Sequence, residues 1–263
     1  MIPAAHRLNI VVPYRDRESH LAQFVPHLAA YMAARHPDLS YRVTVVEQED
    51  DGRPFNRGAL KNIGFLLGEG DSDYVCLHDV DYLPDDADYG WAEDPTPILW
   101  DGALERPIAP DQSDRVIRND LESTFGGVVL VPNGAMRRVD GYSNLYWGWG
   151  FEDFDFSLRI RGRRIATGRR RGRFIPLDHD NEGFNLDATP SPMALVNRGL
   201  FQRLWAGGTI PAGDGLSTAR FEVLARKFLR HDERPQAGPW VQVTVRLNFQ
   251  PTPEQTAAAP PGR

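Results

Sequence analysis

The sequence predicts an α/β fold with a mixed, mostly parallel central sheet flanked by helices. Short apolar runs typical of strands cover residues 8–12, 41–46 and 74–77, and segments with the spacing of amphipathic helices separate them. Strands that alternate with helices in this way form sheets that carry helices on both faces. The chain has 263 residues, of which 41% are hydrophobic, and this is enough to bury one large core. We therefore expect a single domain over residues 1–250.

The first half of the chain supports these elements in order. The first strand ends at Pro13, and apolar residues then recur at helical spacing at Leu21, Phe24, Val25, Leu28 and Met32. The strand at 41–46 is rich in β-branched residues, and a second amphipathic helix begins near Asn56. The third strand, at 74–77, runs directly into Asp79 and Asp81. Because ligands of such sheets bind at the carboxyl ends of the strands, the residues after Pro13 and after the third strand are expected to share one edge.

The second half of the chain is less regular. Residues 84–120 are rich in Asp, Pro and Trp and lack periodicity, which predicts a long irregular excursion. Residues 127–131 are expected to form a buried strand, and residues 241–247 alternate like a late strand. The Pro- and Ala-rich residues 251–263 are predicted to form a disordered tail.

Charge and composition argue against several classes of protein. The net charge of −6 argues against general affinity for nucleic acid. Eight arginines lie between Arg159 and Arg173, and we interpret this run as a solvated strand-and-turn face, with polyanion binding as the weaker alternative. The single cysteine, Cys76, excludes an internal disulfide. Because the sequence contains neither an apolar run of about 18 residues nor a secretory signal, we expect a cytoplasmic protein without a transmembrane segment.

Residues 146–155 combine flexible, aromatic and acidic residues in one short segment, namely Trp147, Gly148, Trp149, Gly150, Glu152, Asp153 and Asp155. Indole faces stack on the C–H surfaces of sugar rings, carboxylates accept hydrogen bonds from hydroxyls or take a proton, and glycines let a loop move. The segment therefore indicates a sugar-binding site, to which Trp91 and Trp100 can add stacking surfaces. A buried aromatic turn before an acidic helix start is the alternative.

Two acidic side chains follow the third strand. Asp79 and Asp81 flank Val80, so both carboxylates point to one side of an extended segment. Hard oxygen ligands of this kind suit Mg²⁺ or Mn²⁺, which such sites share with substrate phosphates. His179 is the histidine best placed to complete a metal site here.

Three arginines are expected near the same edge. Arg15 and Arg17 follow the first strand, and Arg57 stands beside Phe55 at the start of the second helix, where the helix dipole favours an anion. A guanidinium can bind phosphate oxygens in a bidentate manner. Together with the two aspartates, these arginines predict a site for a metal-bound nucleotide diphosphate.

Five motifs occur along the chain: PYRDRESHL at 13–21, FNRGALKNIG at 55–64, DVDYLP at 79–84, FGGV at 125–128 and WGWGFED at 147–153. Two further segments, at 139–144 and 214–218, follow the same pattern. In this combination and order, the chain resembles the β-1,4-galactosyltransferase family over roughly residues 6–248.

The resemblance implies a GT-A-type nucleotide-diphospho-sugar transferase fold and an inverting, metal-dependent glycosyltransferase. Such an enzyme would move galactose or N-acetylgalactosamine from a UDP-sugar to a hydroxyl of a glycan or glycoside acceptor. Asp153 would be the general base, and Glu152 would hold hydroxyls of the donor or acceptor. Trp149, together with Trp147 and Gly150, would lie in the loop that closes over the donor and forms the acceptor site.

The resemblance also assigns the donor and metal residues. Asp81 and His179 would ligate Mn²⁺, with Mg²⁺ as the alternative ion, and Asp79 would lie beside the ion on the donor. The residues around the nucleotide and its sugar would be Pro13, Tyr14, Arg15, Arg17, Phe55, Arg57, Thr124, Gly126 and Gly127.

Three positions depart from the family pattern. The second metal-ligand position falls on Pro176 or Leu177, neither of which can coordinate a metal through its side chain, so we expect weaker metal binding. Phe154 replaces an acidic residue directly after the base, and Thr124 leaves room near the 2-position of the sugar. These positions leave two hypotheses. One is an active transferase that tolerates both sugars, and the other is a catalytically weak or silent nucleotide-sugar- or glycan-binding protein on the same fold.

Overall fold

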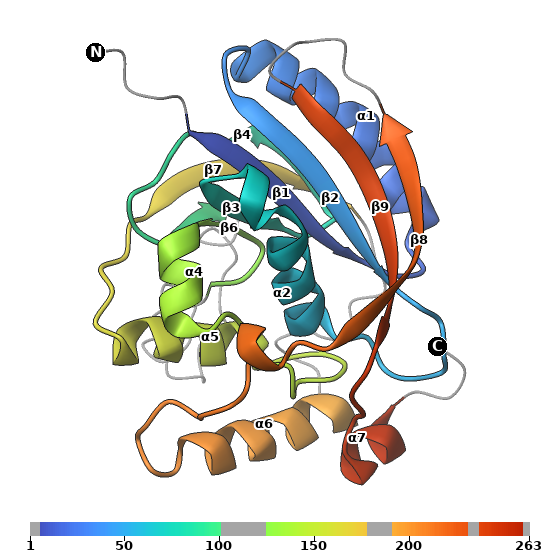
Figure 1. The fold of residues 1–263 in the computed structure, drawn as a ribbon, viewed down its shortest axis with the longest axis vertical. Coiled ribbons are helices and arrows are strands. Elements are labelled where there is room, and N and C mark those ends of the chain that lie inside the picture. Colours follow the sequence, from blue (N-terminus) through green and yellow to red (C-terminus); the bar gives the residue numbers. More distant parts are fainter. Residues whose placement is uncertain (1–5, 101–124, 178–190, 231–236, 260–263) are drawn as a thin grey trace, which may run out of the picture.

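Strand β1 (Arg7–Tyr14) lies in the middle of a nine-stranded sheet, between β2 (Ser40–Gln48) and β3 (Tyr74–His78) (Figure 1). Both neighbours run parallel to it. Every residue of β1 after Arg7 is buried, as expected for a strand that is covered on both faces. The computed structural model describes residues 6–100, 125–177, 191–230 and 237–259.

The three strands predicted in the first half are present, with slightly longer bounds, and the second helix begins directly after Asn56 as expected. The remaining elements are, in chain order, α1 (Glu18–Arg35), α2 (Arg57–Gly68), η1 (Glu69–Asp71), β4 (Tyr82–Asp86), β5 (Thr96–Trp100), β6 (Val128–Pro132), α4 (Asn133–Val139), α5 (Glu152–Gly162), β7 (Arg170–Pro176), α6 (Pro192–Trp205), η3 (Leu216–Thr218), β8 (Phe221–Arg230), β9 (Ala237–Leu247) and α7 (Pro253–Ala258).

The sheet is mixed, and its strand order is β4-β7-β5-β6-β3-β1-β2-β9-β8. Its centre is parallel, because β3, β1, β2 and β9 all run in one direction. Strand β6 is antiparallel to β3, and β8 is antiparallel to β9. Among the described pairings, four of eight are parallel. Three of them form the continuous parallel centre and the fourth joins β5 to β7, so the predicted parallel character holds for the centre and for only one outer pair.

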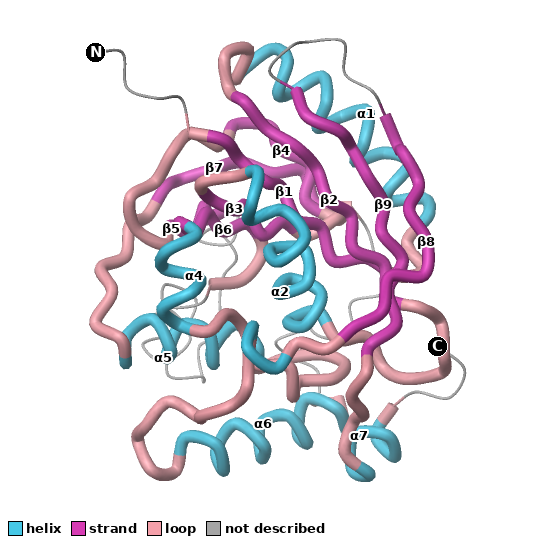
Figure 2. The backbone as a smooth tube through the Cα atoms, viewed as in Figure 1, coloured by secondary structure: helices cyan, strands magenta, loops and turns pink. Residues whose placement is uncertain are grey.

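Helices cover both faces of the sheet (Figure 2). Ile10 and Val12 of β1 belong to one buried cluster with Phe24 of α1, whereas Val11 belongs to a second cluster with Ile63 of α2. This division follows from the alternation of side chains along a strand. Two apolar cores therefore enclose the central strands, one on each face.

Helix α2 packs unusually close to β1 because residue 64 is glycine. A Cβ atom at Gly64 would lie 2.2 Å from a methyl carbon of Val11, so a side chain at this position would push the helix away from the sheet. The close packing fixes the start of α2, and with it Arg57, at the edge where the central strands end.

Two predicted segments are more ordered than expected. The excursion predicted over residues 84–120 includes strand residues of β4 and all of β5, which pair with β7. The tail predicted to be disordered from residue 251 contains α7, which begins with a capping box in which the side chains and backbone N–H groups of Thr252 and Gln255 bond reciprocally. Pro at the first helical position is typical of such a start, and this signal outweighs the low-complexity composition.

The arginine run does not form one uniform solvated face. Arg159 is fully buried and is paired with Asp155 and Asp214. Arg170 donates to the backbone carbonyls of Asp88, Gly90 and Trp91 and so anchors the segment between β4 and β5. Among the described residues, no helix is both long and apolar enough to cross a membrane.

Candidate functional site

The candidate site begins at the first turn of α2. Asn56 caps this helix through its side-chain oxygen, which accepts from the backbone N–H of Ala59 at 2.9 Å. Its side-chain nitrogen donates to the carbonyl of Asn144 at 2.8 Å, which ties the helix start to the segment that leads to residues 146–155. One capping side chain therefore places Arg57 beside the acidic residues that follow.

Arg57 gathers three of the predicted carboxylates. Its Nε and one terminal nitrogen each lie 3.0 Å from an oxygen of Asp79, which makes a bidentate pair. Its other contacts are Glu152, at 2.7 Å, and Oδ2 of Asp153, at 3.2 Å. Asp79 follows β3, whereas Glu152 and Asp153 begin α5, so the guanidinium joins elements that are far apart in the sequence. We call Arg57, Asp79, Glu152, Asp153 and the neighbouring Lys61 the Arg57 cluster.

Burial and charge act against each other in this cluster. Burial alone would lower the pKa of Arg57, but Asp153, Asp79 and Glu152 outweigh it and raise the pKa well above its usual value. Burial, followed by repulsion from Asp153, raises the pKa of Glu152, and Arg57 opposes that shift. A second cation beside the three carboxylates would therefore be favourable here.

Asp153 is held between the two cations of the cluster. Lys61 Nζ lies 3.2 Å from Oδ1, while Oδ2 faces Arg57. A Cβ atom at Gly126 would lie 2.8 Å from Oδ2, so a side chain at this position would push against the carboxylate. The motif that contains Gly126 was predicted to border the site, whereas the role of Lys61 was missed because its position in an apolar helix suggested no contact with the base.

The metal residues are only partly described. Asp81 lies three residues after the end of β3, and its carbonyl accepts from the backbone N–H of Leu177 at 2.8 Å. The Leu177 side chain packs against the apolar core, so it does not occupy a ligand position. His179 lies outside the described residues, as does Thr124. Among the described residues, no three His, Cys, Asp or Glu side chains gather into a metal site.

The predicted nucleotide residues line the end of β1. Pro13 and Tyr14 are buried, and burial raises the pKa of Tyr14. Arg15 lies over the ring of Phe55, with 5.6 Å between the guanidinium carbon and the ring centroid. It also donates to the carbonyl of Arg53 at 2.7 Å. Arg17 stands directly before α1, without a side-chain capping hydrogen bond, and is half-buried. The structure thus brings Arg15 and Phe55 together.

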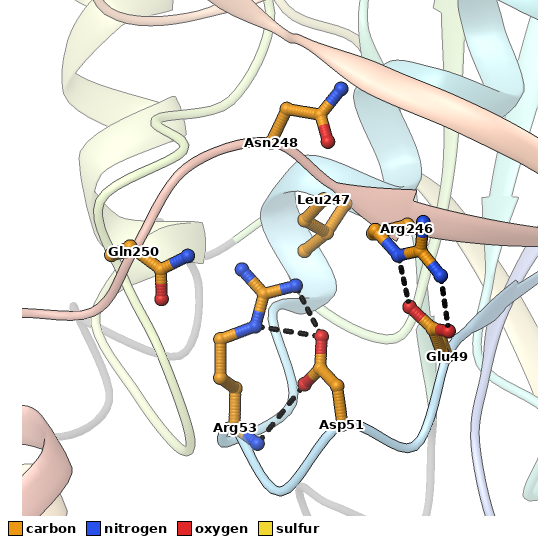
Figure 3. Close-up of a pocket in the computed structure, with 7 residues that line it drawn as sticks. All are labelled: Glu49, Asp51, Arg53, Arg246, Leu247, Asn248 and Gln250. Atoms are coloured by element: carbon orange, nitrogen blue, oxygen red, sulfur yellow. Dashed lines mark hydrogen bonds and ion pairs between the residues drawn. The ribbon is translucent and has the colours of Figure 1, made fainter.

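A surface hollow lies beside this region at the ends of β2 and β9 (Figure 3). Its charged residues are paired with one another, Arg246 with Glu49 and Arg53 with Asp51. Arg53 also donates to the carbonyl of Phe249 at 2.6 Å. These contacts hold the segment around Arg53, whose carbonyl accepts the hydrogen bond from Arg15. None of the residues that line the hollow belongs to the Arg57 cluster.

The two tryptophans of residues 146–155 lie in different environments. Trp147 is buried, packs against Phe249 and lies under the guanidinium of Arg53. The prediction that Trp147 offers a sugar-stacking surface is therefore wrong, because the core covers its indole. Trp149 is 49% exposed and remains available. Trp91 is also unsuitable, since His6 stacks on its ring at 3.8 Å.

Residues 145–150, which we call the tryptophan loop, are held by hydrogen bonds to their backbone. Asn197 of α6 donates to the carbonyls of Trp147 and Trp149, at 2.9 and 3.0 Å. Gln255 of α7 donates to the carbonyl of Leu145 and to Oδ1 of Asn197, both at 2.9 Å. Both amides are buried, and neither was predicted from the sequence, because no motif marks residues that bind a loop only through its backbone.

The other end of residues 146–155 is fixed by a buried ion pair. Asp155 is paired with Arg159, and it also accepts from the Tyr146 hydroxyl and the Trp205 indole N–H, at 3.2 and 2.8 Å. Burial raises the pKa of Asp155, and its contact with Arg159 opposes that shift. Asp155 therefore anchors the loop to α6 in addition to standing at a helix start.

Phe154 occupies an apolar position. Its ring lies 5.8 Å from that of Phe151, which lies 5.5 Å from Phe201 of α6. Phe151 has a positive φ of 75°, a conformation that side chains with a Cβ rarely adopt. The aromatic contacts with α6 give a packing reason for a phenylalanine at position 154.

Two family models match the chain. They are the N-terminal region of glycosyl transferase group 7, over residues 2–91, and the N-terminal domain of galactosyltransferase, over residues 112–180. Together they match more than half of the chain. The Arg57 cluster draws its residues from both regions.

Individual relatives agree with these models. β-1,4-Galactosyltransferase 7 of Drosophila melanogaster is 34% identical over 168 residues, which are 63% of this chain and 48% of that protein. The protein of the same name from Homo sapiens is 34% identical over 169 residues, 64% of this chain and 47% of that protein. The chain thus spans about half the length of these relatives.

Solved structures show the same fold. The catalytic domain of Drosophila β-1,4-galactosyltransferase 7, in complex with xylobiose, matches with a TM-score of 0.68 at 25% identity, over 93% of this chain and 95% of that chain. A mutant of that enzyme in complex with manganese, UDP-Gal and xylobiose matches with a TM-score of 0.67 at 24% identity. The predicted GT-A-type fold is confirmed.

Proposed function

The chain belongs to glycosyltransferase group 7, which includes the β-1,4-galactosyltransferases, and from this premise we propose that it is a metal-dependent, inverting galactosyltransferase. The observation that supports the proposal is the Arg57 cluster, in which Asp79, Glu152 and Asp153 converge on one guanidinium at the carboxyl edge of the sheet. Ligands of α/β sheets bind at this edge.

In the proposed reaction, Asp153 takes the proton of the acceptor hydroxyl. The acceptor oxygen then forms a bond to the anomeric carbon, the bond from that carbon to the diphosphate oxygen breaks, and UDP leaves with the electron pair. Glu152 holds sugar hydroxyls, and Trp149 offers an exposed indole face for a sugar ring. Arg15 and Phe55, which already contact each other, hold the nucleotide together with Arg17.

The proposed metal ion is Mn²⁺, or Mg²⁺ in its place, held by Asp81 and His179. Two observations support this assignment. The Asp81 carboxylate offers an oxygen ligand after β3, and the backbone N–H of Leu177, two positions before His179 in the sequence, donates to the Asp81 carbonyl. A divalent ion would neutralise charge on the leaving diphosphate. A complex of a Drosophila relative contains manganese and UDP-Gal, which supports the same assignment here.

The proposed donor is UDP-galactose, with UDP-N-acetylgalactosamine also accepted, because Thr124 is small. The proposed acceptor class is a glycoside, and a xyloside is the first candidate because the Drosophila catalytic domain was solved with xylobiose. A competition assay with both donors on a panel of glycosides tests this assignment. Exclusive use of UDP-galactose would show that UDP-N-acetylgalactosamine is not a donor.

The central experiment measures UDP release and glycoside formation with Mn²⁺ for the wild type and Asp153→Asn. We expect the substitution to lower kcat at least a hundredfold, which is the usual size of a general-base effect. Arg35→Met, which removes an exposed ion pair with Asp86, is the matched control and should keep wild-type activity. If neither the wild type nor Asp153→Asn turns over while UDP-galactose still binds, the chain is a silent nucleotide-sugar-binding protein.

A further inference from the structure

Lys61 is an unusual residue for this chain. The sequence contains 28 arginines and only two lysines, Lys61 and Lys227. Lys61 lies within α2, and its side chain is 0% exposed, whereas Lys227 is exposed on β8. Buried lysines are rare unless they are paired, so a specific contact is expected at this position.

That contact is with Asp153 on one side and an aromatic ring on the other. Lys61 Nζ lies 3.2 Å from Oδ1 of Asp153 and 4.5 Å from the centroid of the Tyr142 ring. The ring is itself fixed, because the Tyr142 hydroxyl donates to the carbonyl of Phe125 at 3.0 Å and the ring stacks on Phe156 at 4.0 Å. The ammonium group is therefore confined on a rigid surface.

The two oxygens of Asp153 consequently differ. Oδ1 faces an ammonium group that is sealed from solvent, so no substrate can approach it from that side. Oδ2 lies 3.2 Å from Arg57 and beside the backbone of Gly126, where a side chain would press on it because its Cβ atom would come within 2.8 Å. The Asp153 side chain as a whole is 16% exposed. Because Lys61 blocks the Oδ1 side, we infer that an acceptor hydroxyl approaches the partly exposed carboxylate at Oδ2.

We propose that Lys61 is a positioning residue, which holds Oδ1 of Asp153 so that Oδ2 faces the acceptor and takes its proton. The proposal rests on the function proposed above for Asp153. It also explains the choice of lysine in a chain that otherwise uses arginine, because a compact ammonium fits between one carboxylate oxygen and one ring, whereas a planar guanidinium spreads its donors over a wider fork.

The kinetic test compares Lys61→Met, a side chain of similar length without charge, with Lys227→Met as the matched control. We expect Lys61→Met to lower kcat at least tenfold and to change the KM for UDP-galactose less than threefold, and we expect Lys227→Met to behave like the wild type. Lys61→Gln, whose amide can still donate to Oδ1, should recover part of the loss. In an Asp153→Asn background, Lys61→Met should have little further effect on the residual rate.

Two kinetic results would overturn the proposal. One is an unchanged kcat in Lys61→Met, and the other is the same loss of kcat in the presence and in the absence of the Asp153 carboxylate. The second result would mean that Lys61 supports the fold and does not act through Asp153.

A measurement on the free protein keeps the test valid if Lys61→Met does not fold. With ¹⁵N-labelled lysine, the protein should give two side-chain ammonium signals, and Lys227→Met assigns one of them. We expect Asp153→Asn to shift the Lys61 signal and to leave the Lys227 signal in place. An unchanged Lys61 signal would show that the contact is absent. If the Lys61–Asp153 contact is present but the wild type transfers no sugar, the proposed function is wrong, although the contact between the two residues exists.

Discussion

The Arg57 cluster and the tryptophan loop lie side by side in the proposed site, but they are held in different ways. In the cluster, charged side chains contact one another, with Arg57 and Lys61 set against three carboxylates. In the loop, neutral amides from α6 and α7 bind backbone carbonyls, and the side chain of Trp149 stays exposed. The first arrangement fixes the positions of charged side chains, whereas the second fixes the course of the backbone.

This difference has an energetic consequence. Removing one ion from a buried charged set leaves the opposite charges unpaired and is costly, whereas removing one amide leaves a carbonyl without a hydrogen bond and costs less. The cluster should therefore be sensitive to charge and pH, and the loop should respond mainly through its position. The following predictions test this contrast in order of decreasing effect.

The largest effect is expected for Arg57→Met. It leaves the carboxylates of Asp79, Glu152 and Asp153 facing each other, and we expect a loss of about 3 kcal/mol in the free energy of unfolding, together with at least a hundredfold lower kcat/KM. Arg57→Lys keeps the charge but loses the bidentate pair with Asp79, so its activity should also fall steeply. Denaturant unfolding and UDP-release kinetics measure both quantities.

Arg35→Met provides the control for Arg57→Met. Its ion pair with Asp86 is exposed, so we expect the free energy of unfolding to change by less than about 1 kcal/mol and the activity to stay the same. Equal stability losses in the two variants would mean that the Arg57 cluster behaves like a surface ion pair, and the proposed contrast would be lost.

A pH-dependent effect is expected at His78, directly before Asp79. The ring is fully buried, and its Nδ1 N–H donates to the carbonyl of Asp79, so Nε2 accepts from the Tyr89 hydroxyl. Burial lowers the pKa of His78 to about 4, below its usual 6.5. Because the unfolded chain binds the proton more readily, this contribution to stability is complete above pH 6.5 and is lost as the pH falls toward 4. The loss reaches about 3 kcal/mol.

His78→Gln isolates this contribution, because its neutral amide can make the same two hydrogen bonds and does not titrate. We expect the free energy of unfolding of the wild type to fall more steeply than that of the variant between pH 6.5 and 4. Parallel curves for the two proteins would show that His78 does not contribute to acid sensitivity.

The contrast also explains what could be predicted from the sequence. Asp79, Arg57 and Asp153 lie in short motifs at strand ends or helix starts, and their chemistry indicates a site even before their contacts are known. Asn197 and Gln255 were missed because an amide that binds a backbone carbonyl leaves no pattern in the sequence. Trp147 was misjudged for a related reason, since an indole in a glycine-rich loop has the same pattern whether it faces a ligand or the core.

The fold followed the same rule. The central strands were predicted because covered parallel strands are continuous apolar runs, as in β1. Strand β8 was missed, and β7 was anticipated only in part by the strand-and-turn interpretation of the arginine run, because many of their residues are charged and exposed and their periodicity is weak. Helix α7 was missed because six residues between prolines and alanines look like a linker, although the capping box of Thr252 and Gln255 was present in the sequence.

A moderate effect is expected for Asn197→Ala in the tryptophan loop. The substitution removes the donors to the carbonyls of Trp147 and Trp149, so we expect the free energy of unfolding to fall by about 2 kcal/mol. Because the loop then loses its fixed path, we expect the KM for the acceptor to rise severalfold with little change in the KM for UDP-galactose. Asn197→Asp, which also loses the donors and sets a buried carboxylate against the two carbonyl oxygens, should have at least as large an effect. If both variants keep wild-type hydrogen exchange at the amides of Gly148 and Gly150, Asn197 does not hold the loop.

The smallest effect is expected for Gln255→Ala, which reaches the loop through Leu145 and through Asn197. It leaves both donors of Asn197 in place, so we expect the free energy of unfolding to fall by about 1 kcal/mol and the KM for the acceptor to rise about twofold. Thr256→Ala is the matched control, because Thr256 is an exposed neighbour on α7 whose hydroxyl donates to the carbonyl of Thr252 at the start of that helix. Faster amide exchange at Gly148 in Gln255→Ala but not in Thr256→Ala would show that the end of the chain helps to place the tryptophan loop. Equal exchange in the two variants would limit α7 to packing against α6.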